Sequence, residues 1–287
     1  MDGIILIDKP KDVTSFQVCE IIKKKLNVKK VGHGGTLDPF STGLLIIGIN
    51  RGTKLLNFFL EEKKEYTGII EFGKETDTYD ITGNIVKEEE VNLNEDDILK
   101  AIEDFKGVIN QIPPPFSAVK HEGKPLYKYA REGKIIKKSP RQVFIEEFEI
   151  KRFNLPEIEF RIVCSKGTYI RSIAHELGKK LGSCAYLKSL RRTAIGNYKV
   201  ENAFKPEEVS ENSIIPFEEA LNIPKLYVKK NYLRLLKNGA QIKKWYIENM
   251  EDILKDSFSY LICNNIVAIA YTKDGKIFKP KIVYVKS

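Results

Sequence analysis

The amino-acid sequence predicts an α+β protein with a large N-terminal domain and a smaller, mostly β module at its C-terminal end. Two runs of alternating apolar and polar residues, 143–150 and 157–164, are typical of strands in a half-exposed sheet. Apolar residues then recur at helical spacing between residues 170 and 181, which predicts a helix. Near the C-terminal end, the pair Asp274-Gly275 is a hairpin signal between two strand-like segments.

The N-terminal part of the chain alternates strands and helices. Residues 4–7 form a short apolar run that is typical of a strand. Thr14 begins a capping-box pattern, and the apolar spacing after it predicts a helix that ends near Asn27. Further apolar runs predict strands at residues 44–49 and 64–72.

The middle of the chain contains a helix and then a proline-rich segment. Asn94 can cap a helix that stops at Gly107. The three consecutive prolines 113–115 exclude a regular helix or a central strand, because they remove donors and fix φ. Tyr127 and Tyr129 then interleave with lysine and arginine. This pattern fits a surface that grips phosphates and stacks on bases, and it also fits a short amphipathic helix packed on the body.

Length and composition favour a globular protein of two domains. The chain has 287 residues, and the sequence Asn222-Ile223-Pro224 is its best linker, so we expect domains at 1–222 and 223–287. No apolar run approaches the roughly 18 residues of a membrane helix, and we expect a soluble cytoplasmic protein. The cysteines lack zinc or disulfide spacing, and we interpret them as buried thiols.

The basic charge is concentrated in two segments. Residues 223–287 carry 13 Lys and Arg against 5 Asp and Glu, and residues 106–141 carry 9 against 2. Such patches favour a polyanionic partner, nucleic acid first. Solvated lysine-rich faces explain the same charge, because the whole chain is rich in Lys, Glu and Ile as in heat-adapted proteins.

The glycine-rich stretch, residues 31–43, is polar, rich in turns and contains a carboxylate, Asp38. Its apolar flanks predict a loop held rigidly between buried elements, where chemistry tends to lie. Taken alone, Asp38 followed by Pro39 fits a helix N-cap. The glycines match neither of the phosphate-binding patterns GxGxxG and GK(S/T). A lone His33 is weak evidence for a catalytic base, and no metal site is indicated.

Motifs in chain order occupy residues 3–10, 14–15, 32–39, 42–43, 64–66, 76–83, 111–120, Tyr127 and Arg131, 164–171, and 190–192. Together they resemble those of the bacterial tRNA pseudouridine-55 synthases, the TruB family. The resemblance implies a pseudouridine synthase fold, with a mixed, largely antiparallel sheet and flanking helices. For the tail it implies a small β-barrel, similar to the RNA-binding PUA domain.

The resemblance also implies a reaction. Asp38 looks like the catalytic aspartate of a family that detaches uracil from C1′ of its ribose in the tRNA T loop, turns it, and rejoins it through C5. A carboxylate is ionised at neutral pH, and it can either attack C1′ or take a proton from C2′. Neither a cofactor nor a metal is implied.

The remaining site residues are carried over from the same resemblance. Arg171 pairs with Asp38, and this pairing explains a cation in the first helical turn. Tyr66 stacks on the target base and assists in proton removal from C5, while Tyr169 and Leu190 line the uracil pocket. His33 fills the space of the flipped nucleotide.

Two lysines are candidates for substrate contact on the same grounds. Lys9 belongs to the first matched motif. Lys120 is the last residue of the proline-rich motif 111–120, which lies in the segment that resembles the family's mobile thumb loop, about residues 111–140. The chain departs from many relatives at Gly34 and Phe40, where Thr and Leu are frequent. Neither departure removes a group that the mechanism requires.

We predict the first of three functions that stay open at this point. The first is a tRNA pseudouridine synthase that acts as a monomer on the T arm, where it isomerises uridine 55, without a membrane or an obligatory protein partner. The second is a guide-RNA-dependent synthase of the dyskerin type, which shares the loop motif and a PUA tail. The third is a tRNA-binding folding helper with secondary catalysis.

Overall fold

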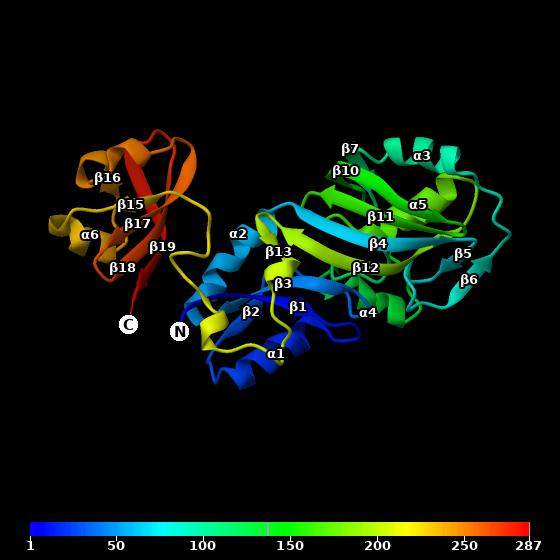
Figure 1. Cartoon of the computed structure of the whole chain (residues 1–287), viewed down its shortest axis with the longest axis horizontal. Coiled ribbons are helices and arrows are strands. Elements are labelled where there is room, and N and C mark those ends of the chain that lie inside the picture. Colours follow the sequence, from blue (N-terminus) through cyan, green and yellow to red (C-terminus); the bar gives the residue numbers. More distant parts are fainter. Residues whose placement is uncertain (137, 287) are drawn as a thin grey trace.

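The computed structural model describes residues 1–136 and 138–286. Lys137, inside the predicted thumb loop, and Ser287, the last residue of the predicted second domain, lie outside the described residues. Figure 1 shows a long body built on one large sheet, with a smaller sheet at one end of the long axis. Among the described residues, none of the helices combines the length and the apolar character that a membrane crossing requires.

The large sheet has ten strands and is mixed but largely antiparallel, as predicted. Its main order is β14-β1-β3-β12-β4-β11-β10-β7, and β3 and β12 are parallel. Short strands β2 and β13 join β3 and β12 at the side. The strands are β1 (Gly3–Lys9), β2 (Val31–His33), β3 (Thr42–Ile49), β4 (Lys64–Phe72), β7 (Gly107–Gln111), β10 (Arg141–Asn154), β11 (Glu157–Cys164), β12 (Ala185–Ile195), β13 (Tyr198–Lys199) and β14 (Ile215–Pro216).

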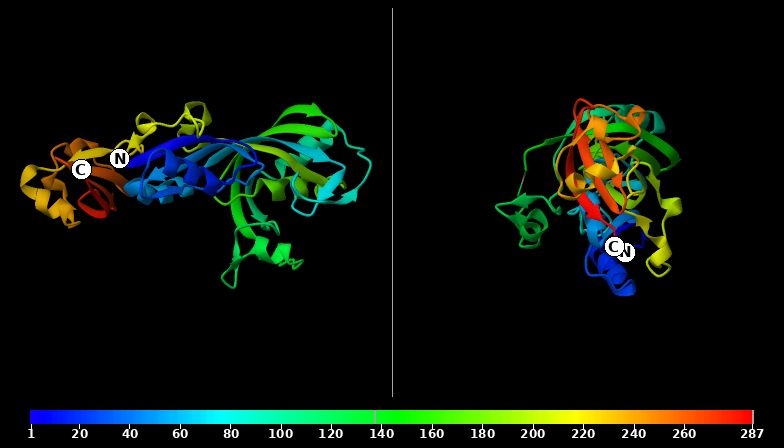
Figure 2. Two further views of the ribbon diagram at one scale, coloured as in Figure 1. Left: turned by 90° about the horizontal axis from the view of Figure 1, so that it is seen from below. Right: turned by 90° about the vertical axis from the view of Figure 1, so that its left-hand side faces the viewer.

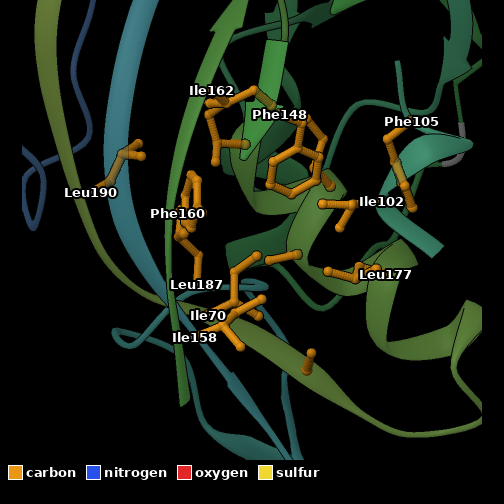
Figure 3. Packing of buried hydrophobic residues seen from close by; sticks show 14 of the residues in the cluster. Ile70, Ile102, Phe105, Phe148, Ile158, Phe160, Ile162, Leu177, Leu187 and Leu190 are labelled. Atoms are coloured by element: carbon orange, nitrogen blue, oxygen red, sulfur yellow. The ribbon is translucent and has the colours of Figure 1, made fainter. Parts of the chain in front are cut away.

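Two helices begin where the sequence predicts their caps. Thr14 forms the predicted capping box of α1, and Asn94 accepts a hydrogen bond from the third residue of α3. The helices of the N-terminal part of the chain are α1 (Ser15–Lys25), α2 (Leu56–Glu61), α3 (Glu95–Glu103), α4 (Leu126–Arg131) and α5 (Ile170–Lys180). Helices α3 and α5 cover one face of the large sheet, and apolar side chains fill the space between them (Figure 3).

The proline-rich segment leads into a projecting hairpin. Strands β8 (Lys120–His121) and β9 (Lys124–Pro125) pair with each other, and α4 follows directly. Figure 2 shows this green segment extending away from the body. A second small hairpin, β5 (Lys74–Thr76) with β6 (Ile85–Glu88), lies beside the end of the large sheet.

The C-terminal part forms a curled five-stranded sheet, in agreement with the predicted small β module. Its order is β15-β17-β18-β19-β16. Its elements are β15 (Lys225–Tyr227), α6 (Leu233–Lys237), β16 (Ile242–Lys243), β17 (Ser257–Cys263), β18 (Ile266–Thr272) and β19 (Ile277–Val285). One face of this sheet contributes Tyr260 and Ile269 to an apolar cluster shared with Ile4 and Phe217 of the N-terminal part. The smaller sheet is therefore packed on the body.

Candidate active site

The loop of the glycine-rich stretch, residues 34–41, is anchored from several sides. Leu37 N donates to Ser15 Oγ at 2.9 Å, at the start of α1. The carbonyl of Pro39 accepts from Asp12 N at 2.8 Å and from Lys9 Nζ at 3.1 Å. The loop therefore holds its side chains in fixed positions, as its flanks predicted.

Glycine is required where the loop enters β3. Gly43 has a φ of 101°, and a β-carbon there would lie 2.3 Å from the carbonyl oxygen of Arg192 on the neighbouring β12. The close approach lets the two parallel strands meet. Just before β3, Ser41 N donates to Asp38 O at 3.0 Å, so residues 38–41 form a turn. The reading of Asp38 as a helix N-cap is therefore wrong.

Asp38 and Arg171 form an ion pair, and this contact was predicted. Arg171 Nε lies 3.0 Å from an Oδ atom of Asp38. The Arg171 side chain is only 5% exposed, whereas that of Asp38 is 37% exposed. A buried cation thus holds a carboxylate that solvent or a substrate can reach.

All three nitrogen atoms of the Arg171 guanidinium have partners. Besides Asp38, it donates to the carbonyls of Thr78 at 3.2 Å and Phe116 at 2.9 Å. A second carboxylate, Asp80, lies 3.2 Å from Nη1. Contacts through all three nitrogen atoms fix the orientation of the guanidinium, and the guanidinium in turn fixes the orientation of the Asp38 carboxylate.

Asp80 is a site residue that the sequence analysis did not single out. It lies in the Asp80 loop, which we define as residues 77–82, and its side chain is 4% exposed. It also accepts from Thr78 Oγ1 at 2.9 Å and from Thr82 N at 2.9 Å. The matched motif at residues 76–83 contained the signal, but two aspartates stand in it and only the structure shows which one is buried.

The surroundings of Asp38 act on its charge in opposite directions. Burial by the surrounding chain raises the pKa of Asp38 above its ordinary value of 3.8, and the Arg171 charge lowers it. Asp80 raises the pKa further and Lys9 lowers it. Arg171 and Lys9 thus favour the ionised form against the effect of burial.

Tyr66 and Leu190 come together on one face of the sheet. Leu190 on β12 belongs to the same apolar cluster as Phe40 from the loop, and Tyr66 on β4 packs against this cluster. Figure 3 shows Leu190 beside the strands at the margin of the core. Tyr66 lies opposite Arg192 in the register of β4 and β12. Burial raises the pKa of the Tyr66 phenol and the Arg192 charge opposes this shift, so the phenol is protonated at neutral pH.

His33 and Tyr169 each lie at the end of a secondary-structure element. His33 ends β2, and burial together with Arg192 lowers its pKa, so its ring is neutral. Tyr169 is the N-cap of α5, next to Ile170 and Arg171. Gln111 receives a hydrogen bond from Tyr169 N at 2.7 Å and returns one to its carbonyl at 3.0 Å.

The two lysine candidates lie in different environments. Lys9 is 0% exposed, and its Nζ donates to the carbonyls of Pro10 at 2.8 Å, Val13 at 2.7 Å and Pro39 at 3.1 Å. Burial lowers the pKa of Lys9 to about 8. Lys120 lies exposed on β8, so it belongs to the projecting hairpin and not to the group around Asp38.

Comparisons with known proteins agree with this geometry. The family described as "TruB family pseudouridylate synthase (N terminal domain)" matches residues 23–170. A tRNA pseudouridine synthase B of Aquifex aeolicus is 45% identical and covers 99% of this chain and 100% of its own length. One of Clostridium tetani is 43% identical over 85% of this chain and 86% of its own. This chain belongs to the TruB family of pseudouridylate synthases.

Two solved structures have a fold similar to that of this chain. The crystal structure of a Cbf5-Nop10-Gar1 complex contains a chain with a TM-score of 0.72 and 25% identity. The likeness covers 99% of this chain and 84% of that one. A chain in an H/ACA RNP bound to a substrate RNA containing 2′-deoxyuridine also has a TM-score of 0.72, at 23% identity, over 99% and 85% of the two chains. The predicted pseudouridine synthase fold is therefore confirmed.

Proposed function

We propose that this chain isomerises uridine 55 in the T loop of tRNA to pseudouridine. One observation carries the proposal: a solvent-accessible carboxylate, Asp38, is held by a buried guanidinium, Arg171, in a chain of the TruB family. The relatives of similar length that are named tRNA pseudouridine synthase B support tRNA as the substrate. The chain then acts as a cytoplasmic monomer that requires no partner protein.

In this reaction the bond between N1 of uracil and C1′ breaks. The base turns, a bond between C5 and C1′ forms, and the proton on C5 leaves for N1 or solvent. Asp38 either attacks C1′ or removes a proton from C2′, and the ionised form serves both routes. The displaced base itself returns to the ribose, so no water has to be activated.

The other site residues receive roles that fit their surroundings. Arg171 keeps Asp38 ionised and oriented. Tyr66 stacks on the flipped uracil with Leu190 and Tyr169 as further walls, and His33 fills the vacated space in the T loop. The neutral state of Tyr66 suits stacking, and a role in C5 proton removal requires that its phenol first lose its own proton.

For Lys9 we propose positioning of the loop in place of direct contact with RNA. Its ammonium already donates to three carbonyls, one of them that of Pro39, which follows the catalytic candidate. Lys120 and the projecting hairpin are proposed to contact RNA, as part of a thumb over residues 111–140. The Arg131 guanidinium lies 5.5 Å from the ring centre of Tyr127 there.

The proposed second domain, residues 223–287 after the catalytic domain 1–222, offers a further RNA-binding surface. The Trp245 surface, as we define it, contains three aromatic rings with exposed cations around them. Tyr232 and Tyr246 stack with ring centres 3.6 Å apart, and Lys243 Nζ lies 5.2 Å from the centre of the Trp245 ring. The remaining cations of this surface are Lys229, Lys230, Arg234 and Lys244. Such a combination suits base stacking beside phosphates.

Locating pseudouridine in tRNA treated with the purified chain tests the proposal. Wild type is expected to modify position 55 of an unmodified transcript, and Asp38→Asn is expected to bind the same tRNA without modifying it. Turnover by Asp38→Asn near the wild-type rate would remove Asp38 from its role. Modification at another position would contradict the assignment to uridine 55.

The structural likeness to a Cbf5-Nop10-Gar1 complex favours one alternative, a synthase that needs partner proteins and a guide RNA. The same transcript assay separates the two. Conversion by the purified chain alone supports the stand-alone enzyme, whereas a strict requirement for added protein and guide RNA supports the alternative.

A further inference from the structure

Helix α5 presents two side chains to the Asp80 loop, one turn apart. Arg171 and His175 stand at positions i and i+4, so they project from the same side of the helix. Arg171 binds the carbonyl of Thr78 and the carboxylate of Asp80. These two residues flank Tyr79, and His175 stacks on the Tyr79 ring.

The stack between Tyr79 and His175 is close and nearly parallel. The ring centres are 3.7 Å apart, and the ring planes differ by 11°. His175 is 2% exposed, and among the described residues its Nε2 has no hydrogen-bond partner. Its Nδ1 lies 3.6 Å from Glu75, which is beyond a normal hydrogen bond. His175 therefore contacts Tyr79 through the face of its ring and not through a hydrogen bond from its nitrogen atoms.

The backbone of Tyr79 is in a conformation that a residue with a β-carbon rarely adopts. Its φ is 62°, in the left-handed region. Its carbonyl accepts from Leu187 N on β12 at 3.0 Å. This turn directs the Thr78 carbonyl and the Asp80 carboxylate toward the same guanidinium, that of Arg171. Contacts around the turn must therefore hold it.

We propose that the stacked pair of Tyr79 and His175 positions the Asp80 loop on α5 and thereby sets the orientation of Arg171 toward Asp38. The inference deepens the proposed function and rests on it for its catalytic meaning. Burial and the Lys179 charge lower the pKa of His175 to about 4. The ring is thus neutral at physiological pH, as a stacking ring should be.

Three substitutions separate the ring stack from other roles of these positions. Tyr79→Gly removes the ring, yet glycine adopts positive φ without strain. His175→Gln keeps polar atoms without an aromatic face, and His175→Phe keeps the face without polar atoms. We expect kcat to fall about tenfold in the first two variants because Arg171 is misplaced. We expect KM for tRNA to stay unchanged and His175→Phe to recover most of the activity.

A direct readout is the pKa of Asp38, measured from its carboxyl ¹³C shift and assigned with Asp38→Asn. The charged groups that face Asp38 are Arg171 from α5, Asp80 from its loop and Lys9 from β1. If the stack positions Arg171, its loss weakens the attraction that favours the ionised form. The pKa of Asp38 then rises in Tyr79→Gly and His175→Gln, a change that loss of stability alone does not produce.

Asp256→Gly is the matched control for Tyr79→Gly. Asp256 also has a positive φ, 48°, but it precedes β17 in the C-terminal sheet. The Asp256→Gly substitution should leave both kcat and the pKa of Asp38 unchanged. An unchanged Asp38 pKa in Tyr79→Gly, or a His175→Phe variant as impaired as His175→Gln, would overturn the inference. If wild type modifies no tRNA, the proposed function fails, while the NMR titration still decides whether the stack positions Arg171.

Discussion

Arg171 Nε lies 3.0 Å from a carboxyl oxygen of Asp38, although the two residues come from distant parts of the chain. The cation is almost fully buried and the carboxylate is partly open. A charge that cannot leave its position therefore determines how the accessible carboxylate points.

The first prediction concerns the geometry of the guanidinium. Arg171→Lys retains a positive charge, but one ammonium cannot reach both carboxylates and the two carbonyls that Arg171 contacts. We expect kcat in single-turnover assays to fall about 100-fold because Asp38 loses its orientation. The matched control is Arg161→Lys. Arg161 pairs with Glu65 on the other face of the sheet, and its replacement should leave kcat near that of wild type. An equal loss of kcat in the two variants would contradict a specific requirement for the guanidinium at position 171.

The second prediction concerns Asp80. Asp80→Asn keeps the size of the side chain and removes one of the two negative charges next to Arg171. Because a buried cation is then only partly compensated, the free energy of unfolding should fall by about 2 kcal/mol. The turnover rate should fall as well, since the guanidinium loses one of its fixed partners. Urea unfolding and single-turnover kinetics measure the two effects. Wild-type values in both assays would contradict the role that we assign to Asp80.

The third prediction is a conflict between activity and stability at Asp38. Its pKa in the fold is raised by burial above 3.8, so ionisation costs the folded state stability. This cost is absent below the unfolded pKa and appears as pH rises through the folded pKa. The melting temperature of Asp38→Asn relative to that of wild type should therefore rise as pH increases from below 3.8 to 7, although Arg171 lacks one carboxylate partner in the variant. The rate of wild type should fall as acid protonates Asp38. A melting-temperature difference between variant and wild type that does not change with pH, or that changes in the opposite direction, would refute the raised pKa.

The local patterns in the sequence predicted many of the elements but not how the residues of the candidate site are arranged. The alternation of apolar and polar residues predicted β10 and β11, and the capping residues Thr14 and Asn94 predicted where two helices begin. These signals are local, so they are readable without knowledge of the fold. The turn after Asp38 was not readable, because Asp-Pro serves equally in a turn and at a helix start.

Long-range packing decided the rest of the candidate site. Asp80 is buried against Arg171 whereas Asp77 in the same motif is not, and no local pattern distinguishes two aspartates three residues apart. The motif made Lys9 a candidate substrate contact, and only the structure shows that the carbonyls of Pro10, Val13 and Pro39 surround its ammonium. The stack of Tyr79 on His175 joins a loop to a helix far along the chain, and periodicity carries no information about such a pair.

The fourth prediction tests the Trp245 surface as an RNA contact that the catalytic site does not need. Trp245 is 57% exposed, and its replacement by Ala should weaken binding of full-length tRNA about tenfold, the loss of one stacked base. Saturating kcat should not change. Phe144→Ala, which removes another exposed ring from β10, is the control and should bind tRNA like wild type.

Salt dependence distinguishes stacking from charge at the Trp245 surface. Trp245→Ala should keep the slope of log Kd against log salt, because it removes no cation. The double variant Lys243→Gln with Lys244→Gln should reduce that slope by about 2, if each lysine neutralises one phosphate. A slope that is unchanged in the double variant would mean that these lysines are solvated surface, and the stacking of Trp245 would then lack its neighbouring phosphate contacts.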